Sequence, residues 1–546
     1  MESDDRLPAK VRLEDDPETY PVEMRFRGNS TRSEPKKGYN IRFDDGDQDF
    51  LDGADRINAR AMWRDPSFVR EHMAMWLFRQ YELPAPDTFF FELFINDVFE
   101  GFYMHVERID RRFSRKRGLN RDATLVRDEF RDQFRDGGND CGVGANKFTA
   151  FADNNWSAMT REQALACVEA RFNDRRADWD EVLDLILWVD QSEPGDRFAE
   201  ELAERVDVEA MMKFLGVHIL IGDIDTFWGN DYWWFKDHED PEAKWFFIPW
   251  DKNLSMGSHT RNDSDGLGAF GQLMFPYEYR HQRFVQQGQH VNRLFSYFMQ
   301  TDALRSQLND WLLEQVDSDT WLSAFDAELE RVLEQTEPYG RPRGLYDNEF
   351  ARNHENHFDL GVAYEEHVEQ VREYRDLRRE HLRIYISGSQ SVGRHERELT
   401  LNETLGEGET LTFVDQFGFT VGRFTAAESV PAGAYIRLAA VAGDPENPIN
   451  KDWLLSSDVP LQGTLSVFYR NDDHGVGTAP GNDFNWYTGG AHSVGNQSRI
   501  RLESGTEGLT VSEPVARPSV NRLDVMIDYA MSGSAEARLT TILDAP

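Results

Sequence analysis

The sequence lacks most of the signatures by which a catalytic or metal site is usually recognised. Only two cysteines occur among its 546 residues, Cys141 and Cys167, and without a CxxC pair a cysteine zinc site is unsupported. Neither a Walker A motif nor a G-x-S-x-G motif is present, so a P-loop and a nucleophile elbow have no support either. The two cysteines fit one disulfide in an exported protein and equally fit two separate thiols.

Apolar runs and positive charge are scarce too. No window reaches the roughly 18 apolar residues that span a bilayer. The acidic start MESDDRLPAK has no apolar core, so it is not a signal peptide, although a chain whose leader had been removed would look the same. Lys and Arg number 60 against 98 Asp and Glu, and the net charge of −38 disfavours nonspecific binding to nucleic acid or anionic membranes. This charge is typical of a solubilising acidic surface, as in a salty habitat, and it would also steer a basic partner toward the protein.

The first part of the chain predicts strands around one helix. A length of 546 residues exceeds one ordinary core, so at least two domains are expected. The segments PVEMRFRG and YNIRFDDG alternate apolar and polar residues and predict strands, and a helix is expected from Pro66, capped by Asp65. The stretch TFFFELFINDVFEGFYMHVE predicts two strands around an Asn96–Asp97 turn. Residues 127–156 are rich in Gly, Asn and Asp and predict a polar loop or insertion.

Helical periodicity then dominates up to about residue 387, where the composition changes. Helices are expected at about 161–171, 178–190, 207–221, 301–335 and 360–387. The segments DYWWFKD and AKWFFIPWD predict a strand pair around the turn-rich HEDPE. Over residues 396–546 short alternating runs rich in Thr, Val, Ser and Gly predict an accessory all-β domain, a sandwich. The overall class is therefore α+β, with a mixed domain over residues 1–390 ahead of the β domain.

The stretch IGDIDTFWGNDYWWFKDHEDPEAKWFFIPWDKN places separated polar groups among many aromatic residues. A buried carboxylate is costly unless its charge is compensated. Asp225 and Asn230 stand as D-x-x-x-x-N, the spacing of the protein-kinase catalytic loop, in which the Asp orients the substrate hydroxyl and the Asn ligates magnesium. Asp251 ends an apolar strand, and a strand pair can return it to the same site. The spacing alone is common, and without further signals it is more typical of a surface Asp and a turn Asn.

A basic cluster in this acidic chain supplies a further signal. The strand–turn–strand segment MRFRGNSTRSEPKKGYNIRF contains Arg25, Arg27, Arg32, Lys36 and Lys37. Its turn, GNST, offers backbone N–H groups and hydroxyls to phosphate oxygens, and a lysine of the following strand can neutralise phosphate charge. Glu107, at a predicted strand end, can pair with that lysine. A solvated basic hairpin and an ordinary surface Glu are the alternatives.

With these motifs the sequence resembles the CotH kinase family, the spore-coat-protein-H-like atypical protein kinases. The resemblance rests on RFRGNSTRSEPKKGYNIRF, WRDPSFVREHMAMWLFRQ, FELFINDVFEGFYMHVERID, GDIDTFWGNDYWWF and KWFFIPWDKNLSMG, in the family's order over residues 20–260. It implies an atypical protein-kinase-like domain over residues 1–390. It also implies ATP as the donor with Mg²⁺, or Mn²⁺ as an alternative, and transfer to Ser or Thr of secreted or coat proteins.

The resemblance also implies roles for individual residues. Asp225 matches the catalytic Asp, and Asn230 and Asp251 match the metal-ligating residues. Lys37 or Lys36 matches the phosphate-binding lysine. Because neighbours on a strand point to opposite faces, only one of the two can face the phosphates. Lys37 is expected to be that residue, since the apolar residues that follow it alternate onto its face.

Further positions match or depart from the family pattern. Glu107 matches the partner of the lysine, and Arg27 and Ser30 fall in the phosphate-facing turn. Family members usually read WDxD where this chain has WDKN, so Asn253 replaces a carboxylate, although an Asn oxygen can still ligate magnesium. Asp223 stands where the family often has Asn, and a carboxylate there can bind a metal or raise the pKa of its neighbour by repulsion.

Resemblance and charge together predict an ATP- and Mg-dependent Ser/Thr protein kinase. Its acceptor is expected to be a secreted or surface protein with basic, Ser/Thr-containing segments, and nucleic acid is not an expected partner. The protein itself is expected to be secreted or at the cell surface, with a cytoplasmic location also open. Two alternatives stay open. The same ATP site can serve nucleotidyl transfer or amino-acid ligation, or the fold can act as a non-catalytic surface adhesin or scaffold.

Overall fold

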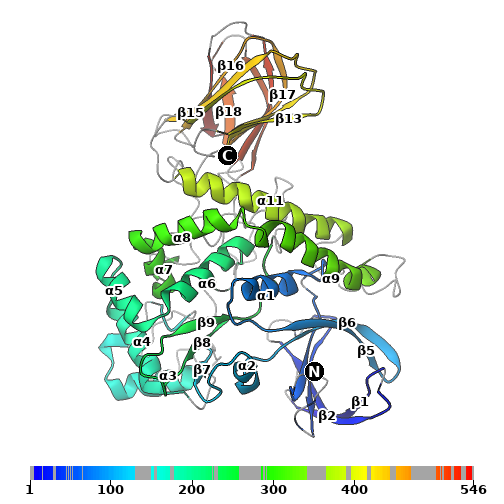
Figure 1. The fold of residues 1–546 in the computed structure, drawn as a ribbon, viewed down its shortest axis with the longest axis vertical. Coiled ribbons are helices and arrows are strands. Elements are labelled where there is room, and N and C mark those ends of the chain that lie inside the picture. The colour runs from blue at the N-terminus through cyan, green and yellow to red at the C-terminus, as the bar shows by residue number, and fades with distance from the viewer. Residues whose placement is uncertain are drawn as a thin grey trace. The chain divides into compact units, whose positions relative to one another are not determined.

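The computed structural model describes most of the chain, which divides into two compact units (Figure 1). The described residues are 5–14, 16–28, 32, 34–44, 46, 48, 51, 53–63, 65–128, 149–152, 156–172, 177–223, 226, 231–256, 285–286, 289–290, 292–340, 364–388, 395–414, 420–442, 451–468, 500–504, 506, 509–517, 522–530 and 536–543. Unit 1 comprises Met1–His259, Arg283–Trp311 and Ser318–Arg372. Unit 2 comprises Thr260–Gln282, Leu312–Asp317 and Glu373–Pro546.

Unit 1 begins with an antiparallel sheet in the strand order β1-β2-β3-β4-β6-β5. Its strands are β1 (Leu7–Val11), β2 (Tyr20–Arg27), β3 (Gly38–Phe43), β4 (Arg56–Arg60), β5 (Thr88–Ile95) and β6 (Val98–Val106). Met24 pairs with Ile41, which pairs with Ile57, so successive strands present apolar residues on one face. These positions form or line a buried core, while the intervening Arg25 and Asn40 share the opposite face.

The β5–β6 hairpin confirms the turn predicted at Asn96–Asp97. These two residues have φ of +52° and +62°, as a two-residue type I′ turn requires. The register runs from Thr88 opposite Val106 to Ile95 opposite Val98.

Helix α1 (Arg70–Gln80) follows β4 and begins later than predicted. The expected start at Pro66 is wrong because Phe68 has a φ of +64°, which lies outside the helical region. Asp65 nevertheless fixes the start. Its Oδ2 accepts the Arg70 backbone N–H at 2.8 Å, and its Oδ1 accepts from the Arg70 guanidinium at 2.7 Å.

The rest of unit 1 is mainly helical, with a second, smaller sheet. Its helices are α2 (Arg111–Lys116), η4 (Trp156–Ala158), α3 (Arg161–Arg171), α4 (Trp179–Gln191), α5 (Asp196–Arg205), α6 (Val208–Ile221), α7 (Arg293–Gln300), the π-helical η6 (Thr320–Ala324) and α9 (Phe325–Gly340). Helices α8 (Asp302–Gln315) and α11 (Tyr364–Gly388) cross the unit boundaries. The second sheet has the order β7-β8-β9 and consists of β7 (Thr124–Val126), β8 (Tyr232–Lys236) and β9 (Phe246–Pro249). A short hairpin pairs β10 (Val285–Gln286) with β11 (Gln289–His290).

Several helices and strands of this region confirm the sequence pattern. Helices α3, α4 and α6 and the β8–β9 pair lie where periodicity placed them, whereas α5 was not predicted. Most of the predicted insertion at 127–156 lies outside the described residues. At its start, buried Asp128 accepts from Arg171 Nε at 2.5 Å and from the Ala150 N–H at 2.6 Å. Cys167 is buried in α3 and disulfide-bonded, and Cys141 lies outside the described residues.

Unit 2 contains two antiparallel sheets in its described part, which confirms the predicted all-β sandwich. Their strand orders are β12-β15-β16-β21-β18 and β13-β14-β17-β20-β19. The strands are β12 (His395–Thr400), β13 (Thr410–Val414), β14 (Thr420–Ala426), β15 (Tyr435–Ala442), β16 (Lys451–Ser457), β17 (Leu461–Phe468), β18 (Ile500–Ser504), β19 (Leu509–Arg517), β20 (Arg522–Tyr529) and β21 (Ala537–Leu543). One core joins both sheets and includes Phe424 of β14 and Trp453 of β16. Among the residues described here, no helix has the length and apolar character needed to cross a bilayer.

Candidate active site

A cluster of charged side chains forms where β4, α1 and the end of β9 meet. Arg60 is the last residue of β4, Glu71 lies in the first turn of α1, and Asp251 follows β9. The guanidinium of Arg60 joins the other two: Nη1 lies 2.6 Å from Asp251 Oδ1, and Nη2 lies 2.9 Å from Glu71 Oε1. The side chain of Asp251 is 34% exposed and that of Glu71 only 4% exposed, so the cluster opens to solvent at Asp251.

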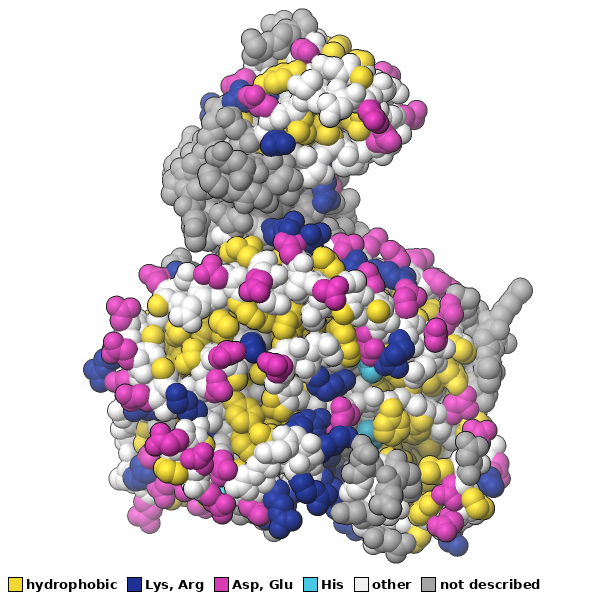
Figure 2. Space-filling view, in the orientation of Figure 1, with side chains coloured by type: hydrophobic (Ala, Val, Ile, Leu, Met, Phe, Trp, Pro, Cys, Tyr) yellow, Lys and Arg dark blue, Asp and Glu magenta, His cyan; other side chains and the backbone are white. Residues whose placement is uncertain are grey.

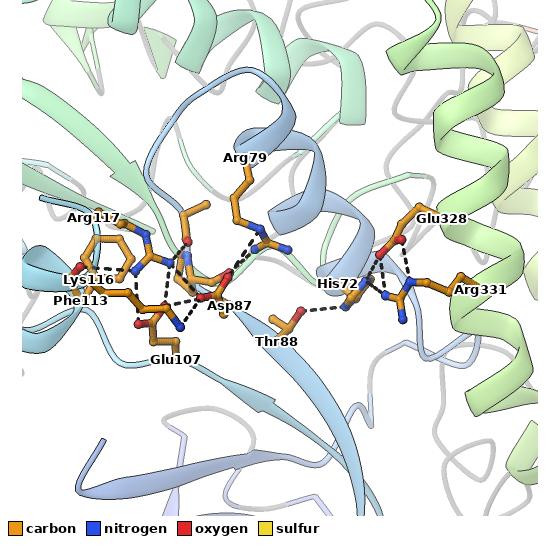
Figure 3. Close-up of polar contacts among 12 residues, drawn as sticks. His72, Arg79, Asp87, Thr88, Glu107, Phe113, Lys116, Arg117, Glu328 and Arg331 are labelled. Carbon is orange, nitrogen blue, oxygen red and sulfur yellow. Dashed lines mark hydrogen bonds and ion pairs between the residues drawn. The ribbon is translucent and has the colours of Figure 1, made fainter. Parts of the chain in front are cut away.

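The local fold explains why these three side chains meet. Arg60 pairs with Met104 of β6, which fixes the end of β4 beside the core under α1. Helix α1 is also anchored on its other side, because His72 Nδ1 lies 2.7 Å from Thr88 Oγ1 and His72 Nε2 lies 2.7 Å from Glu328 Oε1 of α9 (Figure 3). The helix that carries Glu71 is thus bonded to β5 and to α9.

Burial and charge shift the pKa values of this cluster in opposite directions. Burial raises the pKa of Glu71 to about 7, although the Arg60 charge opposes the shift. Burial alone would also raise the pKa of Asp251, but the charges of Arg60, Arg127 and Arg27 outweigh it and lower the pKa. Asp251 therefore stays ionised at neutral pH, as a metal ligand must, whereas Glu71 titrates near neutrality.

Arg27 reaches this cluster from the end of β2 across a glycine. A Cβ on Gly38 would lie 2.9 Å from Arg27 Cγ and 3.3 Å from the Ala59 carbonyl oxygen, so only glycine leaves room for the arginine stem. Burial, followed by the nearby Arg60 charge, lowers the pKa of Arg27 to about 9. Among the described residues, no hydrogen-bond partner meets its buried Nη1 atom. A buried, unpaired guanidinium nitrogen beside a second cation is suited to an anion.

A third arginine closes the cluster from the second sheet. Arg127, which follows β7, lies 3.1 Å from Asp231 Oδ1 through Nη2. The Cζ atoms of Arg60 and Arg127 lie 5.4 and 5.9 Å from the ring centroid of Trp250, so both cations contact this aromatic side chain.

The structure brings some of the predicted site residues into this cluster. Asp251 and Arg27 belong to it, and Asn253 follows at a half-buried position. Asp225, Asn230 and Ser30, expected as catalytic, metal-binding and phosphate-facing residues, lie outside the described residues.

The two adjacent lysines of the hairpin have different surroundings. Lys36 is 1% exposed, donates to the Phe102 carbonyl at 2.5 Å and lies 4.6 Å from the Tyr103 ring centroid. Lys37 donates from Nζ to the Arg32 carbonyl at 2.6 Å, within the turn before β3. The assignment of Lys37 to phosphate stays a prediction.

The expected pairing of Glu107 with a hairpin lysine is wrong. Glu107 pairs with Arg117, with Nη2 to Oε2 at 2.7 Å and Nη1 to Oε1 at 3.2 Å, and its Oε2 also accepts the Asp87 backbone N–H at 3.0 Å (Figure 3). The reason is the strongly basic helix α2, of sequence RRFSRK, which begins four residues after Glu107 and ends one residue before Arg117. Figure 2 shows Lys and Arg side chains gathered in this part of unit 1.

Sequence patterns missed Arg60, Glu71 and Arg127. One signal was available: Arg70, Glu71 and His72 are three consecutive polar residues directly before the apolar run MAMWLF, and all three are less than 5% exposed. Long polar side chains are rarely buried without partners, so such a run indicates a polar network.

Comparison with known proteins gives two matches. A family model described as CotH kinase protein matches residues 24–382. The chain is also similar to the inner spore coat protein H of Bacillus subtilis (strain 168), with 22% identity over 260 residues. That alignment covers 46% of this chain and 63% of the relative, so it spans less than two thirds of the relative's length.

Proposed function

Because the chain belongs to the CotH kinase protein family, we propose that unit 1 is an ATP- and Mg²⁺-dependent Ser/Thr protein kinase. The observation that carries the proposal is the Arg60–Glu71 ion pair beside Asp251. In protein kinases a strand cation pairs with a helix glutamate next to the metal-binding aspartate, and that arrangement binds and orients the nucleotide phosphates. Here the strand cation is an arginine, which can bind two phosphate oxygens at once.

The described side chains fit the phosphates and metal of such a nucleotide. Arg27, with its unpaired Nη1, and Arg60 would hold phosphate oxygens. Asp251 would ligate Mg²⁺, or Mn²⁺ in its place, because its pKa is lowered and its side chain is partly exposed. Asn253 follows on the same segment with a further oxygen. When bound, the metal would supply positive charge that neutralises phosphate oxygens and so would favour phosphoryl transfer.

Sequence position assigns the remaining roles. Asp225 would accept or orient the proton of the acceptor hydroxyl, and Asn230 would complete the metal ligands. Ser30 and Lys37, or Lys36 in place of Lys37, would contact phosphates from the β2–β3 turn. The protein groups would act mainly by holding reactants in position and by neutralising charge.

We infer the class of acceptor from the net charge of the protein, and its location from the name of the similar spore coat protein. The net charge of −38 supports a basic acceptor with Ser or Thr, because opposite charges speed encounter. The name of the relative, inner spore coat protein H, supports a coat or surface location for this protein as well.

The experiment is incubation with labelled ATP and Mg²⁺, followed by mass spectrometry of the modified protein. Phosphate should be transferred by the natural sequence, and Asp251→Asn and Asp225→Asn should lose the transfer. Asp240→Asn is the matched control, because Asp240 lies in the exposed turn between β8 and β9. A mass increase equal to a nucleotide or an amino acid would replace phosphotransfer with another ATP-dependent reaction. Absence of nucleotide binding would contradict the kinase proposal and favour the alternative of a non-catalytic adhesin or scaffold.

A further inference from the structure

We infer that Lys252 is a positioning residue that ties Asp251 both to Asp223 and Thr226, which flank position 225 in the sequence, and to helix α1. This inference rests on the proposed function, because it concerns how the two catalytic segments are held together. Lys252 lies directly after Asp251 and is 0% exposed, so its ammonium group points into the protein rather than to the solvent that reaches Asp251.

The side chain of Lys252 bonds to residues on both sides of position 225. Its Nζ lies 2.8 Å from Asp223 Oδ2 and contacts Thr226 Oγ1, which in turn donates to the same carboxylate oxygen. All three side chains are fully buried. His218 Nε2 lies 3.5 Å from Asp223 Oδ2, and burial together with the Lys252 charge lowers the pKa of His218 to about 3. Because the imidazole is neutral, Lys252 is the cation that balances Asp223 among the residues that the structure describes.

This pairing assigns Asp223 a structural partner. The sequence allowed the Asp223 carboxylate to bind a metal or to raise the pKa of a neighbour. In the structure it pairs with the lysine at the third position of the WDKN motif. A buried charge whose partner is removed is strongly unfavourable, so the pair holds the two segments in one relative position.

The main chain of Lys252 makes the second connection. Its backbone N–H donates to the carboxylate of Glu71, the same group that pairs with Arg60. Four residues later the Met256 N–H donates to the Ile221 carbonyl at 2.7 Å, and the Met256 carbonyl accepts from Arg70 Nε at 3.3 Å. The segment after Asp251 is thus bonded to the end of α6 and to the start of α1.

Asp251 needs such support because its backbone is strained. Its φ is +55°, in the left-handed region that non-glycine residues seldom adopt. Such a conformation persists where the surroundings impose it, and this happens most often at functional sites. The residue before Asp251 is held because the Trp250 N–H donates to the Asp231 carbonyl at 3.1 Å. The residue after it, Lys252, is held by its side-chain bonds to Asp223 and Thr226 and by its main-chain bond to Glu71.

The test compares Lys252→Met, Asp223→Asn and the double variant with both changes. Each single variant leaves one buried charge without its partner and should lower the melting temperature. The double variant removes both charges and should recover much of that loss. It should nevertheless keep a reduced kcat, by roughly 100-fold if Asp251 is displaced by about 1 Å. It should also need more Mg²⁺ for half-maximal activity, with little change in metal-free nucleotide binding.

Two controls separate positioning from general damage. Lys236→Met removes a lysine of β8 that pairs with Glu181 at 2.6 Å, and it should leave kcat and the Mg²⁺ requirement unchanged. Lys252→Arg keeps the charge and should retain more activity than Lys252→Met. A double variant with natural kcat and Mg²⁺ requirement would overturn the inference. Lys252 and Asp223 would then only neutralise each other's buried charge, without positioning Asp251.

A readout without catalysis keeps the inference separate from the proposed function. Amide hydrogen exchange should become faster over 251–256 and at the start of α1 in Lys252→Met and in the double variant. If the natural sequence transfers no phosphate but exchange responds in this way, the kinase proposal fails and the positioning role stands. Unchanged exchange in both variants would overturn the positioning role, whatever the activity.

Discussion

Replacing Glu71 by glutamine should change the pH dependence of stability in a direction that the structure determines. Glu71 is buried beside Arg60, and its pKa rises from the ordinary 4.5 to about 7 in the folded protein. A carboxyl group with a raised folded-state pKa stabilises the fold fully below its unfolded pKa, and this stabilisation is lost as the pH rises through the folded pKa. Glutamine has nearly the same shape and does not titrate, so Glu71→Gln removes this dependence.

The size of the effect follows from the shift. At about 1.4 kcal/mol per pKa unit, the change from 4.5 to about 7 corresponds to roughly 3 kcal/mol over the complete titration. Most of this falls between about pH 5 and pH 8.5, a window that stays above the isoelectric point of 4.7. Relative to Glu71→Gln, the natural protein should therefore lose roughly 2 to 3 kcal/mol of unfolding free energy across that window.

Urea unfolding at a series of pH values would measure the difference, with hydrogen exchange in α1 as a local readout for unit 1. Glu209→Gln is the matched control, since the Glu209 side chain on α6 is 73% exposed. The control should follow the natural protein at every pH. Parallel stability curves for the natural protein and Glu71→Gln would refute the raised pKa and, with it, the buried charge cluster around Arg60.

Three further outcomes are expected. Mg-ATP at a hundredfold excess over its Kd should stabilise the fold by about 2.7 kcal/mol, and Asp251→Asn should remove the metal-dependent part of the thermal shift. A thermal shift independent of metal would contradict this role. Gly38→Ala should weaken nucleotide binding about 10- to 100-fold in calorimetry, because displacing Arg27 loses a charge-assisted contact worth ~1.5–3 kcal/mol; unchanged affinity would exclude Arg27 from the phosphate site. Ser peptides with basic flanks should be phosphorylated faster than acidic ones, and added salt should reduce the difference; no preference at low salt would disprove steering.

Local sequence patterns predicted much of the fold because they act over short distances. Helix α3 spans the predicted 161–171, where Thr160 and Gln163 form a capping box that the sequence itself contains. Strand β4 was missed because RINAR offers few apolar residues, and its place depends on pairing with β3 on one side and, on the other, with β6, which follows only after α1 and β5. The start of α1 was misplaced because the positive φ of Phe68 has no local signature.

The candidate site was predictable only where one short motif carried it. Asp251 stood out at the end of an apolar strand, and the basic hairpin indicated Arg27. Arg60 and Glu71 were not predictable in this way, because their role depends on contacts with residues far away in the sequence. Arg60 and Asp251, for example, are 191 positions apart. Spacing rules cover contacts within one strand or helix, whereas this ion-pair cluster exists only after β4, α1 and β9 have packed together.

The guanidinium at the end of β4 determines which chemical reagents can label this position. Reagents that acylate a lysine need an amine that can lose its proton, whereas an arginine side chain stays protonated and is a poor nucleophile. A nucleotide analogue with an acyl group on its phosphate would therefore find no amine at Arg60. Dicarbonyl compounds, which condense with guanidinium groups, are the matching chemistry, and bound nucleotide would protect Arg60 from them. Acylation by such an analogue would accordingly report Lys37, or Lys36 in its place, and not the cation that pairs with Glu71.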